Sequence, residues 1–512
     1  MLHHMKKSLR MYAPAVLSGS LLMLCFPTFD LSPLAWIALA PLLVSLWDKK
    51  PKEAFMSGML AGIFYFFGTL YWIYHSITYY GSVPLVVSLF VVLLLCLYLS
   101  LYPGVFALIF SHKIRTTRLP ALLLAPVFWV SLEFVRSYAL TGFPWSSIGY
   151  SQYRFLYGIQ VADITGIYGV SFLVVAVNGA IADIFISRKR IAEMPLFPAR
   201  QAFISYSIMS LVIIAVFSYG YWRLHEHREG NSVRVSVIQG NIEQDMKWEP
   251  AYQHEVITIY EDLSKQAAAS SPSLIVWPET SLPFFFDDSS HSRELVAFQR
   301  QLGTYLLFGS VLVKSPPSEK TPASLTNSAI LLEKNGNVSF MYDKIHLVPF
   351  GEYIPLRNIF FFVNKLVVGI GDYVPGDKYI KAQTVFGSFG TFICYEIIFP
   401  GLVRKFYAKD GDFIVTITND AWFGKTAGPY QHFSMAVFRA IENRKPVIRA
   451  ANTGISGFID SNGRIMKTSA LFERQIETMD VKTDHSRSLY SRYGDIFSYL
   501  CIVTALTFLL LL

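Results

Sequence analysis

The segment Leu274-Ile275-Val276-Trp277-Pro278-Glu279 has the pattern of a fully buried β-strand that ends at a proline and presents a carboxylate. Two further segments end in a similar way. Phe392-Ile393-Cys394 presents a thiol, and Phe340-Met341-Tyr342-Asp343 runs directly into Lys344. Because ligands gather beyond the carboxyl ends of strands in α/β sheets, a Glu, a Cys and a Lys at three strand ends outline a catalytic site.

The sequence around these segments alternates between β-rich apolar runs and helical stretches, which is typical of an α/β domain with mixed sheets. The predicted domain covers residues 223–494 and is long enough to bury its own core. A polar turn at 334–337 joins the runs 329–333 and 338–342 into a hairpin. Further strands are predicted at 233–238, 274–277, 305–313, 390–394, 413–418 and 447–451, and helices at 252–269, 293–302 and 431–443.

On both sides of this domain the sequence is strongly apolar. A membrane-spanning helix needs about 20 mostly apolar residues. We predict a membrane α-helical bundle of eight spans, with a seven-span region over residues 1–222 and an eighth transmembrane helix over 495–512. The expected spans are 13–29, 31–47, 54–73, 83–110, 119–135, 159–186, 202–222 and 496–512.

Basic residues alternate between the loops that join these spans. Thirteen Lys and Arg residues lie in the N-terminal segment and in the loops after spans two, four and six, whereas the opposite short loops hold little beyond Arg136 and Arg154. The positive-inside rule therefore predicts that the N- and C-termini are cytoplasmic and that residues 223–494 are exported. We interpret part of the net charge of +8 as this orientation signal, and expect no nucleic-acid partner.

The composition agrees with a membrane protein. Hydrophobic residues make up 53% of the chain and charged residues only 16%, against about 25% in soluble domains. The four cysteines are too sparse for a disulfide scaffold. Cys25, Cys96 and Cys501 fall within predicted spans, so Cys394 is the single cysteine of the exported domain. Such a lone thiol is either buried and inert or held for its chemistry.

The three strand ends resemble the Glu–Lys–Cys triad of the nitrilase, or carbon–nitrogen hydrolase, superfamily. Within it, the chain is most similar to the apolipoprotein N-acyltransferase family, and the likeness spans nearly the whole sequence, including the eight-span layout. It is carried by the segments Lys344-Ile345-His346-Leu347-Val348-Pro349-Phe350-Gly351-Glu352, Asn419-Asp420-Ala421-Trp422-Phe423-Gly424, Gln431-His432, Arg449-Ala450-Ala451-Asn452-Thr453-Gly454 and Thr141-Gly142-Phe143-Pro144-Trp145.

This resemblance implies an αββα sandwich on the outer, periplasmic face of the bacterial inner membrane. It implies transfer of a fatty acyl chain from a phospholipid, through a Cys thioester, to the N-terminal amine of a diacylglyceryl-cysteine apolipoprotein. The expected catalytic residues are Glu279 as the base, Lys344 at the oxyanion and Cys394 as the nucleophile. We expect neither a cofactor nor a metal, and a monomeric chain.

Other residues have weaker expected roles. Glu352 and Glu396 are expected to support Lys344, and the backbone N–H of Tyr395 to join the oxyanion site, although both carboxylates could simply cap backbone groups. Substrate-binding residues are expected at Asn419, Trp422 and Trp145, although Trp is more often part of a core or an interfacial anchor. His432 is expected to be structural.

Two phenylalanine runs, 284–286 and 360–362, follow Glu279 and Glu352. They are expected either to dip into the lipid and gate acyl entry, or to pack in the core. Two rival functions also stay open at this point. A membrane-tethered amidase or nitrilase would pass the acyl group to water, and a transporter or binding protein would carry an inactive hydrolase-like domain. Eight spans exceed what an anchor requires, which favours a donor that arrives through the bilayer.

Overall fold

The structure is a computed structural model that describes residues 2–117, 119–190, 199–226, 230–244, 246–287, 289–316, 323–354 and 372–511. The chain forms two compact units. The helical unit comprises Met1–Tyr74, Pro84–Glu226 and Tyr493–Leu512, and the sandwich unit comprises His75–Val83 and His227–Arg492. The predicted seven-span region, residues 1–222, includes the segment 75–83, which here clusters with the sandwich unit.

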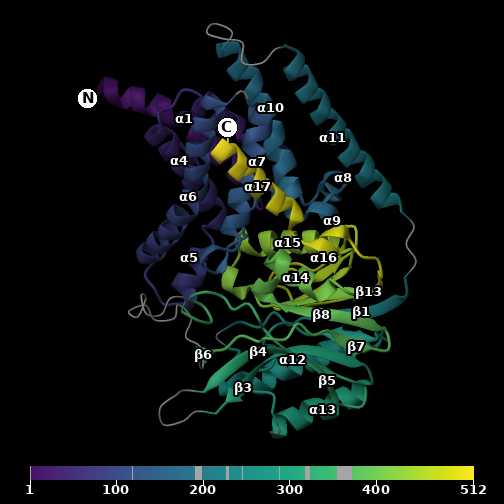
Figure 1. Cartoon of the computed structure of the whole chain (residues 1–512). Helices are drawn as coiled ribbons and strands as arrows, with labels where there is room; N and C mark the ends of the chain where they lie inside the picture. Colours follow the sequence, from purple (N-terminus) through teal and green to yellow (C-terminus); the bar gives the residue numbers. More distant parts are fainter. Residues whose placement is uncertain are drawn as a thin grey trace. The chain divides into compact units, whose positions relative to one another are not determined.

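The helical unit is built almost entirely from helices (Figure 1). Its main helices pack through small residues. In α4, a Cβ added to Gly58 would lie 2.1 Å from the carbonyl oxygen of Pro103 in α6, so the absent side chain lets the two helices approach closely. The helices are α1 (Leu2–Leu24), α2 (Ala35–Ala38), α3 (Ala40–Leu46), α4 (Pro51–Leu70), α6 (Leu85–Thr116), α7 (Ala121–Arg136), α8 (Leu156–Ile159), α9 (Ala162–Thr165), α10 (Ile167–Arg190), α11 (Ala199–His225) and α17 (Ile496–Leu511). After α4 the chain forms α5 (Ile73–His75) and the π-helical turn η2 (Ser76–Tyr80), and α16 (Leu489–Tyr493) precedes α17.

Among the described residues, four helices are long and apolar enough to cross a membrane: Pro51–Leu70, Leu85–Thr116, Ile167–Ile186 and Phe203–His225. They coincide with the predicted third, fourth, sixth and seventh spans. The predicted second and eighth spans correspond to shorter apolar helices, Ser32–Leu46 and Ile496–Leu511. The first and fifth predicted spans overlap α1, which ends at Leu24, and α7, which has 16 residues. The helical membrane region is thus confirmed at the level of four candidate spans.

The sandwich unit contains two mixed β-sheets. The first has the strand order β13-β1-β2-β3-β4-β5, with β6 paired to β4, and the second has the order β12-β11-β10-β9-β8-β7. The first sheet comprises β1 (Ser232–Gln239), β2 (Leu274–Val276), β3 (Tyr305–Ser315), β4 (Ser324–Leu332), β5 (Val338–Asp343), β6 (Asp372–Tyr373) and β13 (Gln475–Lys482). The second comprises β7 (Ala382–Thr384), β8 (Gly387–Ile393), β9 (Phe413–Thr418), β10 (Val447–Ala451), β11 (Gly457–Ile459) and β12 (Ile465–Thr468).

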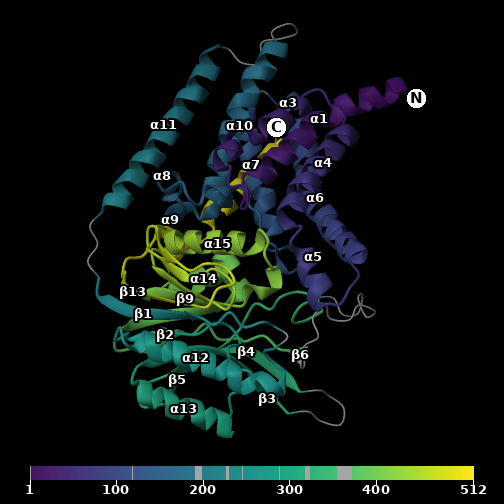
Figure 2. The same ribbon diagram turned by 180° about the vertical axis from the view of Figure 1, so that it is seen from behind.

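Helices cover the outer face of each sheet, as both views show for the sandwich unit (Figures 1 and 2). The first sheet is covered by α12 (Gln253–Ala268) and α13 (Ser290–Leu302), and the second by α14 (Pro400–Tyr407) and α15 (Gly428–Asn443). The apolar side of α12, including Val256 and Tyr260, packs with Ile275, Leu306 and Ile330 in one buried core. The predicted αββα sandwich is therefore confirmed.

The topology brings several chain segments to one edge of each sheet. Strands β8, β9 and β10 are parallel neighbours, so the residues that follow them, Cys394, Asn419 and Asn452, leave the second sheet at the same end. In the first sheet, β2 lies between parallel neighbours β1 and β3, and Glu279 follows it after Trp277 and Pro278.

Candidate active site

Glu279 is buried and accepts hydrogen bonds on both carboxylate oxygens. Oε1 accepts from Nδ2 of Asn327 at 2.8 Å and lies 3.5 Å from Nζ of Lys344. Oε2 accepts from the backbone N–H of Asn419 at 2.9 Å, and the main-chain carbonyl accepts from Lys247 at 3.1 Å. Every neighbour named is a donor, which is the environment that an ionised carboxylate, an acceptor only, requires when it is buried.

Lys344 follows β5 and lies between two carboxylates. Its Nζ donates to Oε1 of Glu352 at 3.0 Å, in addition to the contact with Glu279, and its side chain is 1% exposed. Burial opposes the charge on Lys344, but Glu352 and Glu279 outweigh it and raise its pKa above the ordinary value. The side chain is therefore a fixed cation at neutral pH.

Cys394 directly follows β8 and is buried, with a backbone φ of +52°. This left-handed conformation is uncommon for a residue other than glycine and stores strain that the surroundings must hold. Burial raises the pKa of the Cys394 thiol, nearby Glu279 raises it further, and Lys344 acts against both. The resting side chain is thus a thiol, and a base would have to take its proton before the sulfur could act as a nucleophile.

Glu396 connects the segment after Lys344 to the end of β8. Its Oε1 accepts from the Tyr342 hydroxyl at 2.7 Å and from the backbone N–H groups of Ile345 and His346, and Oε2 accepts from Ile393 N–H at 2.8 Å. Burial raises its pKa to about 7, although these donors favour the ionised form. Glu396 therefore fixes two backbone segments, and the Lys344 ammonium has its direct hydrogen bond with Glu352.

Two supporting residues are missing from the sequence-based prediction. Asn327, in the middle of β4, uses Nδ2 to bridge Glu279 and Glu352 at 2.8 and 3.1 Å. Lys247 is fully buried against the Glu279 carbonyl, and burial lowers its pKa to about 8 while Glu279 opposes the shift. Asn327 lies in the polar N-terminal half of β4, between Thr326 and Ser328, and Lys247 lies in an irregular stretch, so no local pattern marks either residue.

His432 contacts the backbone of Cys394. Its Nε2 lies 3.1 Å from the Cys394 carbonyl oxygen, which can only accept, so this nitrogen carries the hydrogen. Its Nδ1 lies 3.0 Å from both Asp420 and Arg449, and Arg449 donates to Asp420 at 2.8 Å. Burial opposes ionisation of Asp420, but Arg449 and His432 lower its pKa to about 2. These contacts connect His432 to the backbone of the strained residue Cys394 and to the buried pair Asp420 and Arg449.

Comparison with known proteins agrees with this geometry. A model of the apolipoprotein N-acyltransferase N-terminal domain matches residues 18–180, and a carbon–nitrogen hydrolase model matches residues 234–490. The apolipoprotein N-acyltransferase of Geobacter metallireducens is 44% identical over 500 residues, covering 97% of this chain and 94% of that protein. The chain belongs to the apolipoprotein N-acyltransferase family. This confirms the predicted resemblance and the acyltransferase class.

More distant relatives extend the comparison. The apolipoprotein N-acyltransferase of Pasteurella multocida is 33% identical and covers 98% of this chain and 95% of its own length. Among solved structures, an amidase from Nesterenkonia sp. has 18% sequence identity and a TM-score of 0.39, and covers 53% of this chain and 98% of the amidase.

The remaining predicted site residues of this family member divide between the two units. Tyr395 is buried and packs its ring against Phe399, at 5.0 Å between centroids. Asn419 also donates through Nδ2 to Gln244 at 2.6 Å. Trp145 lies in the helical unit, buried against Trp72 at 4.9 Å.

The first phenylalanine run packs in the sandwich unit. Phe284 and Phe286 are partly buried against the core beneath α12 and α13, and Phe286 meets Phe308 edge-on at 5.3 Å. Phe285 lies 6.1 Å from the ring of Trp248. Core packing, one of the two open interpretations, therefore describes Phe284 and Phe286. The run 360–362 lies outside the described residues.

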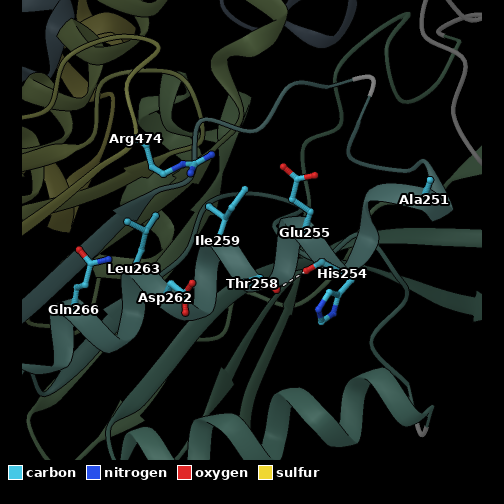
Figure 3. A pocket seen from close by; sticks show the side chains of 9 residues that line it. All are labelled: Ala251, His254, Glu255, Thr258, Ile259, Asp262, Leu263, Gln266 and Arg474. Atoms are coloured by element: carbon cyan, nitrogen blue, oxygen red, sulfur yellow. Dashed lines mark hydrogen bonds between the residues drawn. The ribbon is translucent and has the colours of Figure 1, made fainter.

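A surface groove along α12 is separate from these residues (Figure 3). Its walls include Glu255, Asp262 and, from the segment before β13, Arg474. Within it, the Thr258 hydroxyl donates to the His254 carbonyl at 2.8 Å. None of the predicted catalytic or substrate-binding residues lines this groove, so the chemistry is assigned to the end of the sheets and not to α12.

Proposed function

We propose that this chain transfers a fatty acyl group from a bilayer phospholipid to the N-terminal amine of a diacylglyceryl-cysteine apolipoprotein, through a thioester on Cys394. Its family membership supports an acyltransferase acting on a lipoprotein. The observation that carries the proposal is the buried set formed by Glu279, Lys344 and Cys394 in one compact unit, in which Glu279 and Lys344 both act on the pKa of the thiol.

In the first half-reaction, Glu279 takes the proton from the Cys394 thiol as sulfur attacks the ester carbonyl carbon of the phospholipid. The oxyanion of the tetrahedral intermediate faces the fixed ammonium of Lys344. The carbon–oxygen bond to the glycerol then breaks, and the departing lysophospholipid alkoxide takes the proton from Glu279. The products are an acyl thioester on Cys394 and a lysophospholipid with a free hydroxyl, and Glu279 is again a carboxylate.

In the second half-reaction, the amine of the apolipoprotein attacks the thioester carbonyl. Glu279 takes a proton from the attacking nitrogen, Lys344 again faces the oxyanion, and the carbon–sulfur bond breaks. The proton on Glu279 returns to the Cys394 thiolate, which restores the thiol. Because both half-reactions use one nucleophile in turn, ping-pong kinetics are expected.

Supporting roles follow from the contacts of each residue. Glu352 accepts hydrogen bonds from Lys344 and from the backbone of Val348, and so holds the cation in place. Glu396 fixes the backbone that flanks Lys344 and Cys394, and we assign an oxyanion-site N–H to Tyr395. We assign substrate contacts to Asn419, Trp422 and Trp145.

We further propose that the protein is a multi-pass protein of the bacterial inner membrane. Residues 1–222 supply seven spans, residues 223–494 form the periplasmic catalytic domain, and residues 495–512 supply the eighth span. The four candidate spans and the alternation of basic loops support this arrangement, which puts both termini in the cytoplasm. We also propose a monomer, which is supported by the location of Glu279, Lys344 and Cys394 in one unit of one chain.

The test is mass spectrometry of a lipoprotein N-terminus after incubation with phospholipid and the full-length protein in detergent. We expect one acyl chain on the amine with the wild type, and none with Cys394→Ala. Acylation by Cys394→Ala would overturn the proposal. Free fatty acid in place of acylated lipoprotein would also overturn it, in favour of a membrane-tethered amidase-type hydrolase that uses the same three residues.

A further inference from the structure

The segment 75–83 connects two candidate membrane spans, α4 and α6, yet it belongs to the sandwich unit. Its central part is the π-helical turn η2 (Ser76–Tyr80). Such turns are rare and occur often at functional sites, where they redirect a few side chains. The question is therefore what the side chains of this turn hold.

Two hydroxyls of the turn donate to neighbouring carbonyls of the loop 419–424. Ser76 Oγ donates to the Trp422 carbonyl at 2.6 Å, and the Tyr80 hydroxyl donates to the Ala421 carbonyl at 3.1 Å. The Tyr80 ring also meets the Trp422 ring edge-on, with centroids 4.6 Å apart. These contacts join residues about 340 positions apart in sequence.

Gly424, at the end of the loop 419–424, packs closely against His75 of the segment 75–83. Gly424 has φ +61°, and a Cβ built on it would lie 2.5 Å from Nε2 of His75. A side chain at this position would be strained by its backbone and would also displace the His75 ring. The loop is therefore shaped to receive the segment 75–83.

The other side of the loop reaches both proposed reacting groups. The Asn419 N–H donates to Oε2 of Glu279 at 2.9 Å. The next residue, Asp420, contacts His432, whose Nε2 donates to the Cys394 carbonyl. One short loop thus fixes the orientation of the base and, through one histidine, the backbone of the nucleophile.

We propose that Ser76 and Tyr80 are positioning residues for acyl transfer, which hold the loop 419–424 in the register that aligns Glu279 with Cys394. This inference rests on the proposed function of those two residues. The membrane-side connection between α4 and α6 thereby becomes part of the catalytic apparatus, and the chemistry depends on a segment that the isolated sandwich domain, residues 223–494, does not contain.

The experiment uses the full-length protein with Ser76→Ala, Tyr80→Phe and the double variant. The matched control is Tyr79→Phe, in the same turn, because Tyr79 is 67% exposed. Thioester formation is followed by intact mass across phospholipid concentrations, and thiol reactivity by the rate of Cys394 alkylation with iodoacetamide. We expect kcat to fall about fivefold in each single variant and further in the double variant, with KM unchanged, slower alkylation, and a wild-type rate in the control.

A higher KM with unchanged kcat would overturn the proposal, because the segment would then be a wall of the lipid site. Unchanged kcat and alkylation rates in both single variants would also overturn it. Thermal melts of the two single variants identify any variant that is poorly folded, and the rate of Cys394 alkylation is then compared per folded molecule. If Cys394→Ala forms no thioester while the Ser76 and Tyr80 variants react at normal rates, only this inference is rejected. If Cys394→Ala still forms a thioester, the proposed function itself is rejected.

Discussion

Lys344 is the residue whose removal separates stability from catalysis most clearly. Its ammonium is 1% exposed and lies 3.0 Å from Glu352 and 3.5 Å from Glu279. Lys344→Met leaves Glu279, which is buried, and Glu352, which is 14% exposed, without their shared cation. Removal of one partner of a buried ion pair costs about 3–5 kcal/mol. For a domain of this size the expected loss in Tm is roughly 10 °C.

The catalytic loss is a separate quantity. Removing one oxyanion donor costs about 3–4 kcal/mol of transition-state stabilisation, so thioester formation should slow by roughly 100- to 1,000-fold. The double variant Lys344→Met/Glu352→Gln removes one of the unpaired charges. It should recover part of the lost Tm and none of the lost rate.

The assay combines thermal melts of the full-length protein in detergent with single-turnover thioester formation, measured by intact mass below the melting range of every variant. Recovery of the rate in step with Tm in the double variant would refute the reasoning, because Lys344 would then act only through stability. A wild-type rate in Lys344→Met itself would do the same.

Three further predictions concern the supporting residues. Asn327→Ala should lower kcat about tenfold, since the lost hydrogen bonds are to charged groups, and Asn327→Asp should be worse because it adds a third carboxylate; equal rates in the two variants would contradict this. His432→Phe keeps a ring but loses the donor to the Cys394 carbonyl, so Cys394 alkylation should slow about tenfold, and an unchanged alkylation rate would show that the contact is dispensable. Glu396, with a folded pKa of about 7 against 4.5, destabilises the folded state increasingly as pH rises through that interval. Between pH 4.5 and about 7, the free energy of unfolding of the wild type should therefore fall by roughly 3 kcal/mol relative to that of Glu396→Gln. The same pH dependence in both proteins would contradict the burial argument.

Local patterns were sufficient to predict much of the fold and several of the site positions. Apolar runs that stop at a polar residue marked β2, β5 and β8, and those same stops pointed to Glu279, Lys344 and Cys394. The strand neighbours followed less directly, because the order β13-β1-β2-β3-β4-β5 joins strands from the two ends of the domain. Strands β1 and β13 pair although more than 200 residues separate them in the sequence, and no local pattern indicates this pairing.

The supporting residues were hidden for the same reason. Asn327 is one of four polar residues in β4, and only its hydrogen bonds in the folded domain show that it is the one that contacts Glu279 and Glu352. Ser76 and Tyr80 resembled part of a loop between membrane spans, because their partners lie in the loop 419–424. The ends of strands therefore allow candidate reacting residues to be predicted from the sequence. The residues that position them can be identified only from contacts in the folded chain.

Burial of the reacting groups links the chemistry to the choice of acceptor. Glu279, Lys344 and Cys394 are at most 7% exposed, and burial raises the pKa of the thiol, so the enzyme rests without a free thiolate. Attack then requires a carbonyl close enough for Glu279 to take the proton at the same moment. The same burial limits the access of water to the thioester that forms. In the proposed mechanism, a thioester shielded in this way reacts only with an amine whose binding energy brings it into the buried site. Exclusion of water from the thioester is therefore what distinguishes a transferase from a hydrolase built on the same three residues.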